Sequence, residues 1–312
     1  MTCTRLQAQE LFPYAEAAST LPKHVGQARI MYMNYKEQTS NRIKNWYGLQ
    51  YSYGITPKWT VGTTVGVSNH HFNKFPSDIQ TYFFNHHLRS YPGATTLIEG
   101  INVRTKYRFY TRDRHQEHLR ASFYFQGCKS FVAHDEAEPV LTTDNSGIGG
   151  GLIGTYLIKK FAVSMTIDYI YPMAYYQDNI GLMFRSGNAM EISTSFGYRV
   201  WPFKYNSYND VNVNFYAEFL MKQYGRATVR ENGKYWVFEN FQYSDPYIYA
   251  TLKENFYIDG RFYIQLIFQS NDRIDFGVYF PMVSRSYNYW YPHYMVQYTT
   301  TLYGKKSKKV TR

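Results

Sequence analysis

The sequence predicts an all-β protein: a transmembrane antiparallel up-and-down β-barrel of 12 strands. Three observations predict this fold. Runs of about ten residues alternate apolar with small or polar side chains, which is the period of a strand with two unlike faces. About ten residues is also the length that a tilted strand needs to cross a bilayer. Aromatic residues make up 20 % of the chain, with 34 tyrosines and 22 phenylalanines, and barrels place such residues at both membrane interfaces.

The clearest pair of strands lies within residues 46–68, on either side of a turn at Gly54–Lys58. The apolar face of the first strand carries Tyr47, Leu49, Tyr51 and Tyr53. The apolar face of the second carries Trp59, Val61, Thr63, Val65 and Val67. The opposite faces hold glycine, serine, threonine and Gln50, so this pair has one face suited to lipid and one suited to a polar interior.

Further runs with the same alternation follow in order along the chain. They span about 25–34, which precedes the hairpin, and then 97–110, 119–126, 148–158, 161–169, 190–199, 212–219, 262–268, 274–280 and 294–302. In the run at 97–110, Ile101 and Val103 face one way while Arg104 and Lys106 face the other. Glycine-rich 148–158 is interpreted as a strand at a bend of the barrel. The connections at 69–96, 129–147 and 172–187 are unpatterned and are expected to be long loops.

These runs and the hairpin give twelve strands, and single-chain bacterial barrels have even strand counts. Residues 223–257 are ambiguous, and a thirteenth strand at 247–255 would break the even count. That segment is therefore expected to be a loop hairpin or a strand extension, with a 14-strand barrel as the alternative. If the first strand rises, the short turns at Gly54, Lys159 and Asn271 all fall on one side and the long connections on the other.

The segments outside the barrel follow from this arrangement. Residues 1–8 are interpreted as the remnant of a signal peptide, with cleavage after Ala8. Residues 9–23 are expected to lie in the periplasm before a barrel of residues 24–303, and residues 304–312 form a basic periplasmic tail. The expected location is the outer membrane of a Gram-negative bacterium, with both termini in the periplasm. A mean hydropathy of −0.49 argues against membrane helices.

Several stretches also resemble a known group of proteins. These are PYAEAASTLPKHV (13–25), KYRFYTRD (106–113), GGGLIGTYLIKKFAVS (149–164), WPFKYNSYNDVNVNFYAEF (201–219) and DRIDFGVYF (272–280). They are similar to a poorly characterised family of bacterial outer-membrane β-barrels, described as transporter-like or likened to barrels of the MetA pathway of phenol degradation. The resemblance implies a membrane barrel. It implies no defined substrate and no catalytic residues, and residues 223–257 are longer than the connection usual in that family.

The candidate site consists of residues on the inward faces of the predicted strands. The expected lumen-lining residues are Arg29, Gln50, Arg104, Lys106, Arg108, Arg120, Asp168, Glu191, Glu218 and Asp275. A run of positive groups inside a pore favours anions. The other interpretation is structural: the cations pair with carboxylates such as Asp168, Glu191, Glu218 and Asp275, because an unpaired charge inside a small barrel is costly. The two can coexist in a wet lumen.

Metal, cofactor and enzyme chemistry have weaker signals. The pairs His70–His71 and His86–His87 and the spaced His115 and His118 have no cysteine or carboxylate at structural-zinc spacing, so neither a metal site nor a cofactor is expected. No nucleophile motif such as G-x-S-x-G is present, and an enzyme embedded in the barrel is the least favoured function. The net charge of +11 comes with no nucleic-acid-binding motif, so no nucleic-acid partner is expected.

The sequence thus favours an outer-membrane channel or transporter for the passive passage of a small polar, possibly anionic, solute. The alternative is a non-conducting structural or accessory barrel in a larger outer-membrane complex. The aromatic stretch YWVFENF (235–241) motivates that alternative, because exposed aromatics suggest a protein partner at the extracellular loops. The other expected partners are outer-membrane lipid and the solute itself.

Overall fold

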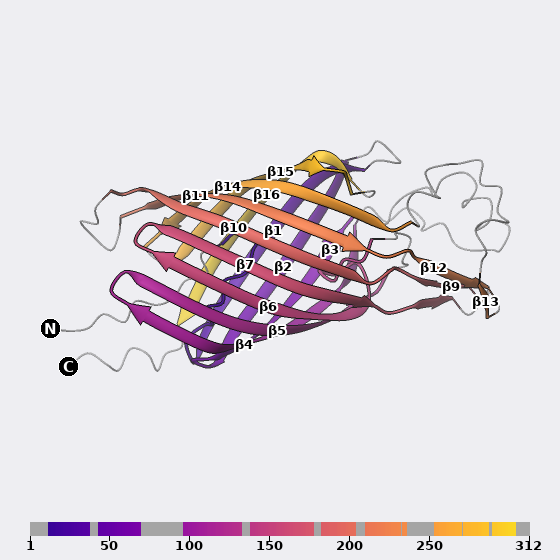
Figure 1. The fold of residues 1–312 in the computed structure, drawn as a ribbon, viewed down its shortest axis with the longest axis horizontal. Helices are drawn as coiled ribbons and strands as arrows, with labels where there is room; N and C mark the ends of the chain where they lie inside the picture. Colours follow the sequence, from indigo (N-terminus) through magenta and orange to yellow (C-terminus); the bar gives the residue numbers. More distant parts are fainter. Residues whose placement is uncertain are drawn as a thin grey trace.

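Twelve strands close into one antiparallel barrel in the computed structural model of the chain (Figure 1). The structure describes residues 12–37, 43–69, 96–132, 138–177, 182–203, 210–231, 233–235, 253–269, 271–286 and 289–303. The barrel strands are β1 (Val25–Glu37), β2 (Ile43–Thr56), β3 (Trp59–Ser68), β4 (Leu97–Arg114), β5 (Glu117–Ser130), β6 (Gly147–Ile158), β7 (Phe161–Pro172), β10 (Ala189–Trp201), β11 (Asn212–Tyr224), β14 (Asn255–Phe268), β15 (Asp272–Val283) and β16 (Tyr289–Tyr303). The predicted 12-strand barrel is confirmed, and the 14-strand alternative is wrong.

The barrel closes where β1 pairs with β16, from Val25 opposite Tyr303 to Glu37 opposite Tyr289. Closure removes the free edges that an open sheet would expose. Every other neighbour is the next strand along the chain, except that β7 pairs with β10 and β11 with β14. A thirteenth strand was considered at residues 247–255. Of the described residues in that segment, only Asn255 belongs to a barrel strand, and it begins β14.

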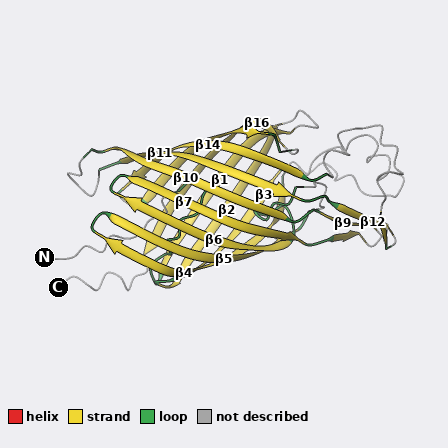
Figure 2. Ribbon diagram, in the orientation of Figure 1, coloured by secondary structure: helices red, strands yellow, loops and turns green. Residues whose placement is uncertain are grey.

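A second, smaller sheet forms from the connection between β7 and β10 and the connection between β11 and β14. Its strands are β8 (Tyr175–Gln177), β9 (Leu182–Arg185), β12 (Thr228–Glu231) and β13 (Lys234–Tyr235), in the order β13-β12-β9-β8. Figure 2 shows β9 and β12 projecting beyond the barrel. The sequence predicted a loop at 172–187 and left 223–257 ambiguous. These strands pair with one another outside the barrel, so no lipid face imposes the alternation that revealed the others.

The two ends of the barrel differ in how the strands are joined. Short turns join β2 to β3, β4 to β5, β6 to β7 and β14 to β15 at one end, which we call the turn end. Because Val25 pairs with Tyr303, β1 also begins and β16 also ends there. The small sheet lies beyond the opposite end, which we call the loop end (Figure 1). The expected grouping of short turns is therefore present.

The outer surface is apolar along the whole wall. Side chains that alternate outward include Ile30, Leu49, Val103, Phe125, Leu152, Ile167, Phe215, Phe262, Phe276 and Val296, and all of them are exposed. None of Ile101, Phe123, Val163 or Ile192, which share the outward faces, is buried in a core. This band of apolar side chains is the surface that a transmembrane barrel presents to lipid.

A cluster of buried side chains lines the inner wall along β11, β14, β15 and β16. Tyr216, Tyr263, Tyr279 and Met295 form one buried cluster there. The ring of Tyr263 lies directly over Gly277 of the neighbouring strand, since a Cβ atom built on Gly277 would come within 2.2 Å of that ring. A residue with any side chain at position 277 would displace the tyrosine, so this glycine permits the close approach.

Candidate functional site in the barrel interior

Residues 12–21, which we call the inner segment, lie inside the turn end of the barrel, whereas Lys23 and His24, which lead into β1, are exposed. Phe12, Ala15, Ala17, Ala18 and Leu21 are all buried. Residues 9–23 were predicted to precede the barrel as a periplasmic entry segment; in the part that the structure describes, residues 12–21 instead pack against the inner wall. The segment has no apolar period because it is not packed as a helix or a strand. Its small residues bring the backbone itself against the wall.

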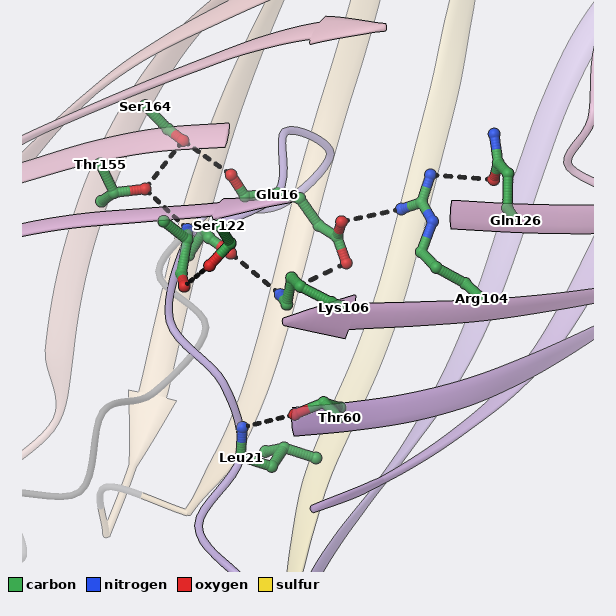
Figure 3. A network of polar contacts seen from close by, with 11 residues as sticks. Glu16, Leu21, Thr60, Arg104, Lys106, Ser122, Gln126, Thr155 and Ser164 are labelled. Carbon is green, nitrogen blue, oxygen red and sulfur yellow. Dashed lines mark hydrogen bonds and ion pairs between the residues drawn. The ribbon is translucent and has the colours of Figure 1, made fainter. Parts of the chain in front are cut away.

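Backbone groups of the inner segment bond to inward side chains around the barrel (Figure 3). Ala18 N–H donates to Thr155 Oγ1 at 2.8 Å, and Leu21 N–H donates to Thr60 Oγ1 at 2.9 Å. Lys106 Nζ donates to Ala17 O at 2.9 Å, Ser164 Oγ donates to Glu16 O at 2.6 Å and Gln297 Nε2 donates to Pro13 O at 2.8 Å. These partners come from β3, β4, β6, β7 and β16. Contacts on so many strands fix the segment within the lumen.

Two aromatic side chains anchor the beginning of the inner segment. Phe12 packs edge-on against Tyr216, with ring centroids 5.6 Å apart. Tyr14 lies against the Arg261 guanidinium at 3.6 Å, and Tyr279 lies on the same guanidinium at 4.6 Å. Aromatic faces attract a guanidinium electrostatically, and the attraction strengthens where water is excluded. The segment is thus fastened to the side of the wall that holds the buried cluster.

Glu16 is the charged residue of the inner segment that meets the wall cations. Its carboxylate lies 3.0 Å from Arg104 Nη1 and 3.5 Å from Lys106 Nζ. Arg104 Nη2 also donates to Gln126 Oε1 at 3.0 Å. Burial would raise the pKa of Glu16, but Arg104, Lys106 and Arg29 together hold that pKa below its ordinary value. Glu16 is therefore ionised at neutral pH.

Acid should weaken this attachment. A carboxyl whose pKa is lowered by folding contributes its full stabilisation above the ordinary value of 4.5 and loses it as the pH falls through the folded-state value. We expect the thermal unfolding midpoint of the wild type to fall toward that of Glu16→Gln as the pH drops from about 5 to 3. A constant difference between the two proteins over this range would contradict the assignment.

A second element enters the lumen from the loop end. Residues 138–146, between β5 and β6, form what we call the inward loop. Glu138 is buried and accepts hydrogen bonds from Tyr257 OH and Ser286 Oγ, both at 2.5 Å. Lys222 Nζ lies 3.2 Å from Glu138 and donates to Pro139 O at 2.7 Å. One end of the inward loop is therefore attached to β11 and β14.

The other end of the inward loop is attached to β2, β3 and β4. Glu99 accepts hydrogen bonds from Thr143 Oγ1 at 2.8 Å, from Trp46 Nε1 at 2.9 Å and from Ser68 Oγ. Asn102 Nδ2 donates to Leu141 O at 2.6 Å. In the strand order, β3 and β4 stand nearly opposite β11 and β14. The loop thus crosses the lumen.

Five of the ten predicted lumen residues contact the inner segment or its surroundings. Arg104 and Lys106 meet Glu16, as described. Arg108 donates to Pro57 O at 3.0 Å, and Arg120 pairs with Asp113 at 3.2 Å and donates to Ser19 Oγ at 2.8 Å. Glu218 accepts from Ala15 N–H at 3.3 Å and from Ser195 Oγ at 2.9 Å. Arg104 and Lys106 therefore pair with Glu16, and Arg120 with Asp113, instead of with the expected wall carboxylates.

The remaining five predicted residues lie elsewhere on the inner wall. Asp275 is fully buried and pairs with Arg273 at 3.0 Å. Glu191 pairs with Lys222 at 2.9 Å, and Asp168 accepts from Tyr124 OH at 2.7 Å. Arg29 Nε donates to Thr299 Oγ1 at 3.3 Å, and Gln50 stands opposite Arg29 in the strand register. The structure does not bring all ten residues into one cluster.

Sequence reasoning missed Glu16, Glu99, Glu138 and Lys222, and it assigned Gln126 to the inward face of the predicted strand at 119–126 without naming it as a site residue. Lys222 continues the inward face of the predicted strand at 212–219, so its position was available from the alternation. Glu16 had a weaker signal, as the single acidic residue in a run of small side chains. Glu138 and Glu99 had none, because their partners lie far away in the chain.

One arc of the inner wall keeps partly exposed polar side chains. They are Arg29, Gln50, Arg104, Gln126, Asp168 and Glu191, which we call the lane residues. The register makes them three cross-strand pairs: Arg29 with Gln50, Arg104 with Gln126, and Asp168 with Glu191. They lie on β1, β2, β4, β5, β7 and β10. The inward side chains of β11, β14 and β16 are buried, so the lumen is filled unevenly.

Metal chemistry finds no support in the described part of the chain, where no three His, Cys, Asp or Glu side chains could hold one ion. His70, His71, His86 and His87 lie outside the described residues. His118 Nδ1 lies 2.9 Å from Asp113 at the turn end. Among the described residues, no helix is long and apolar enough to span a bilayer.

Comparison with known proteins identifies the architecture. Neither a protein-family model nor a curated protein matches the sequence. An outer membrane channel from Pseudomonas putida F1 has a similar structure, with a TM-score of 0.59 and 12 % identity over 94 % of this chain and 100 % of that chain. The NanC porin gives a TM-score of 0.43 with 8 % identity, covering 89 % and 99 %. Outer membrane phospholipase A from Escherichia coli gives 0.37 with 8 % identity, covering 88 % and 89 %.

At 12 % identity, the similarity to the Pseudomonas protein shows the fold alone. At the level of the fold, the predicted resemblance to outer-membrane β-barrels is confirmed. The barrel therefore resembles Gram-negative outer-membrane proteins in its fold.

Proposed function

We propose that this barrel is an outer-membrane channel for the passive passage of a small polar solute. The observation that carries the proposal is the partial exposure of the lane residues, at positions that face the interior. The side chain of Arg104 is 29 % exposed and that of Glu191 is 19 % exposed, although both point away from lipid. Polar side chains that line an interior and meet solvent are the lining that a selective pore requires.

The inner segment and the inward loop would set the width of this passage. One enters from the turn end and the other from the loop end, and both leave the lane residues partly exposed. Their presence favours small solutes over large ones. We place the turn end in the periplasm and the loop end outside the cell, since bacterial barrels carry short turns on the periplasmic side.

The charge of the lane favours no simple ion preference. Arg29 and Arg104 are cationic, whereas Asp168, Glu191 and the neighbouring Glu16 are acidic. Because Glu16 offsets Arg104 and Lys106, the anion preference suggested by the cations alone would be moderate in the wild type. A polar solute that carries at least one anionic group fits this mixture.

Planar-bilayer recording of the purified protein tests the channel. We expect small, stable conductance steps, and we expect Gln50→Trp to lower the step size about twofold or more by narrowing the lane. The matched control is Leu49→Trp, which adds the same ring on the adjacent lipid-facing position and should leave the step unchanged. If the two variants changed the step size equally, the lane residues would not line the conducting path.

Silence in the bilayer would favour the second candidate, a non-conducting accessory barrel. The small sheet supports that candidate, because β8 and β13 are its outer strands and could each pair with another chain. Tyr176 of β8 is 57 % exposed. The aromatic stretch 235–241 that first motivated this function lies, apart from the backbone of Tyr235, outside the described residues. Silent preparations that also co-purify with a second outer-membrane protein would establish it.

A further inference from the structure

We infer that Arg104, Lys106 and Gln126 form a binding site for the carboxylate group of a small solute, and that Glu16 occupies this site as an internal ligand. This inference rests on the proposed function, because it names the chemical group of the solute that would pass through the channel. The binding itself can be measured without any conductance. Figure 3 shows the carboxylate of Glu16 between the two cationic side chains.

The site is held in place by its own contacts. The Arg104 guanidinium lies 4.2 Å over the ring of Tyr124, and Gln126 Oε1 accepts from its Nη2 atom. Tyr124 is in turn fixed by its hydrogen bond to Asp168. A guanidinium whose plane is fixed presents its N–H groups in a constant direction, which suits a planar carboxylate. The side chain of Lys106 is only 4 % exposed and adds a second, enclosed charge.

Glu16 fills this site incompletely. Its Oε2 atom is 3.0 Å from Arg104 Nη1 but accepts no hydrogen bond, and its Oε1 atom is 3.5 Å from Lys106 Nζ. The hydrogen bond from Lys106 to Glu16 Oε1 is long at 3.5 Å, since charge-assisted bonds of this kind are normally 2.7–2.9 Å long, and the contact of Oε2 with Arg104 is an ion pair without a hydrogen bond. A carboxylate free of the chain could adopt the better geometry.

The site borders the lane. The side chain of Arg104 is 29 % exposed and that of Glu16 is 20 % exposed, whereas the Glu16 Oε2 atom is buried. The inner segment is held mainly through its backbone and aromatic side chains, so the Glu16 side chain can swing aside while the segment stays. Leaving the enclosed Lys106 and its neighbour Arg104 without an acid is costly in free energy. A solute carboxylate would therefore have to replace Glu16 as it leaves.

Chemical rescue of Glu16→Ala tests the site. The substitution removes the side-chain carboxylate, which propionate can restore. We expect propionate to raise the thermal unfolding midpoint of the purified variant, with about tenfold tighter binding than propionamide, its neutral analogue. Sodium chloride at the same ionic strength is the salt control. The wild type should respond weakly, because Glu16 competes for the site.

Two further variants sharpen the test. Glu16→Ala with Arg104→Gln should lose the response to propionate. Glu117→Ala removes an acid that pairs with Arg114 at 3.9 Å at the turn end and should show no rescue. If Glu16→Ala does not fold alone, the yield of folded protein on refolding with propionate replaces the melting point as the readout.

The outcomes separate this inference from the channel proposal. Equal stabilisation by propionate, propionamide and chloride would overturn the carboxylate site, whatever the conductance. Rescue by propionate in a protein that is silent in bilayers would support the site and overturn the channel. Rescue by phosphate or sulfate but not by propionate would show an inorganic oxyanion site and would likewise overturn the inference.

Discussion

A chain that begins at Pro22 is expected to conduct severalfold more current per channel than the full-length protein. Residues 12–21 fill the turn end of the lumen, where Phe12, Ala17 and Ala18 are buried against the wall. The wall itself begins at Val25 and closes through β1 and β16, so the truncation leaves the barrel intact. Single-channel recording of the two refolded proteins in planar bilayers measures the difference.

The same truncation should shift the reversal potential toward anions. Loss of Glu16 leaves Arg104 and Lys106 without their acid, and Arg120 loses its contact with Ser19. Full-length Glu16→Gln separates the two effects, since it removes the charge but keeps the segment. It should become more anion-selective with little change in step size. A truncated protein with unchanged step size would show that the inner segment does not limit the passage.

Lys222→Met is expected to destabilise the protein by about 3–5 kcal/mol, because it leaves enclosed carboxylates without their cation. Lys222 is buried, lies 2.9 Å from Glu191 and 3.2 Å from Glu138, and bonds to Pro139 O. The inward loop should also detach from the wall, because Lys222 contacts Glu138 and Pro139 of this loop. Guanidinium unfolding in detergent measures the free energy, and protease cleavage within residues 138–146 reports the loop.

Two controls accompany that measurement. Adding Glu138→Gln and Glu191→Gln to Lys222→Met removes the stranded charges and should recover part of the loss. Lys58→Met, at an exposed position in the β2–β3 turn, should change the free energy of unfolding by no more than about 0.5 kcal/mol. A loss for Lys222→Met as small as that of Lys58→Met would show that the ion pairs do not hold the loop.

The wall of the barrel was predictable because each of its residues meets one of two simple surroundings. Ile101 and Val103 face lipid while Arg104 and Lys106 face the interior, and this two-residue alternation repeats in all twelve strands. The pattern is local, so a window of ten residues reveals it. The small sheet was missed because Thr228–Glu231 and Leu182–Arg185 pair only with other short strands and have no lipid face.

The contents of the barrel were not predictable in this way. Alternation says that Arg104 points inward, but it does not say what meets it there. Glu16 lies on a segment without periodicity, and its partners on β4 stand about 90 residues away in the chain. The inner segment makes many of its contacts through backbone groups, which every residue carries. No side-chain pattern could therefore mark them.

The sequence by itself determined the wall: how many strands cross, which faces meet lipid, and which side chains turn inward. Only the tertiary structure decided what the enclosed space holds, namely that residues 12–21 enter from one end, that residues 138–146 cross near the other, and that Glu16 lies between Arg104 and Lys106. The physical reason is that contact with lipid is a condition on each strand alone, whereas a filled interior depends on segments that meet only once the barrel has closed.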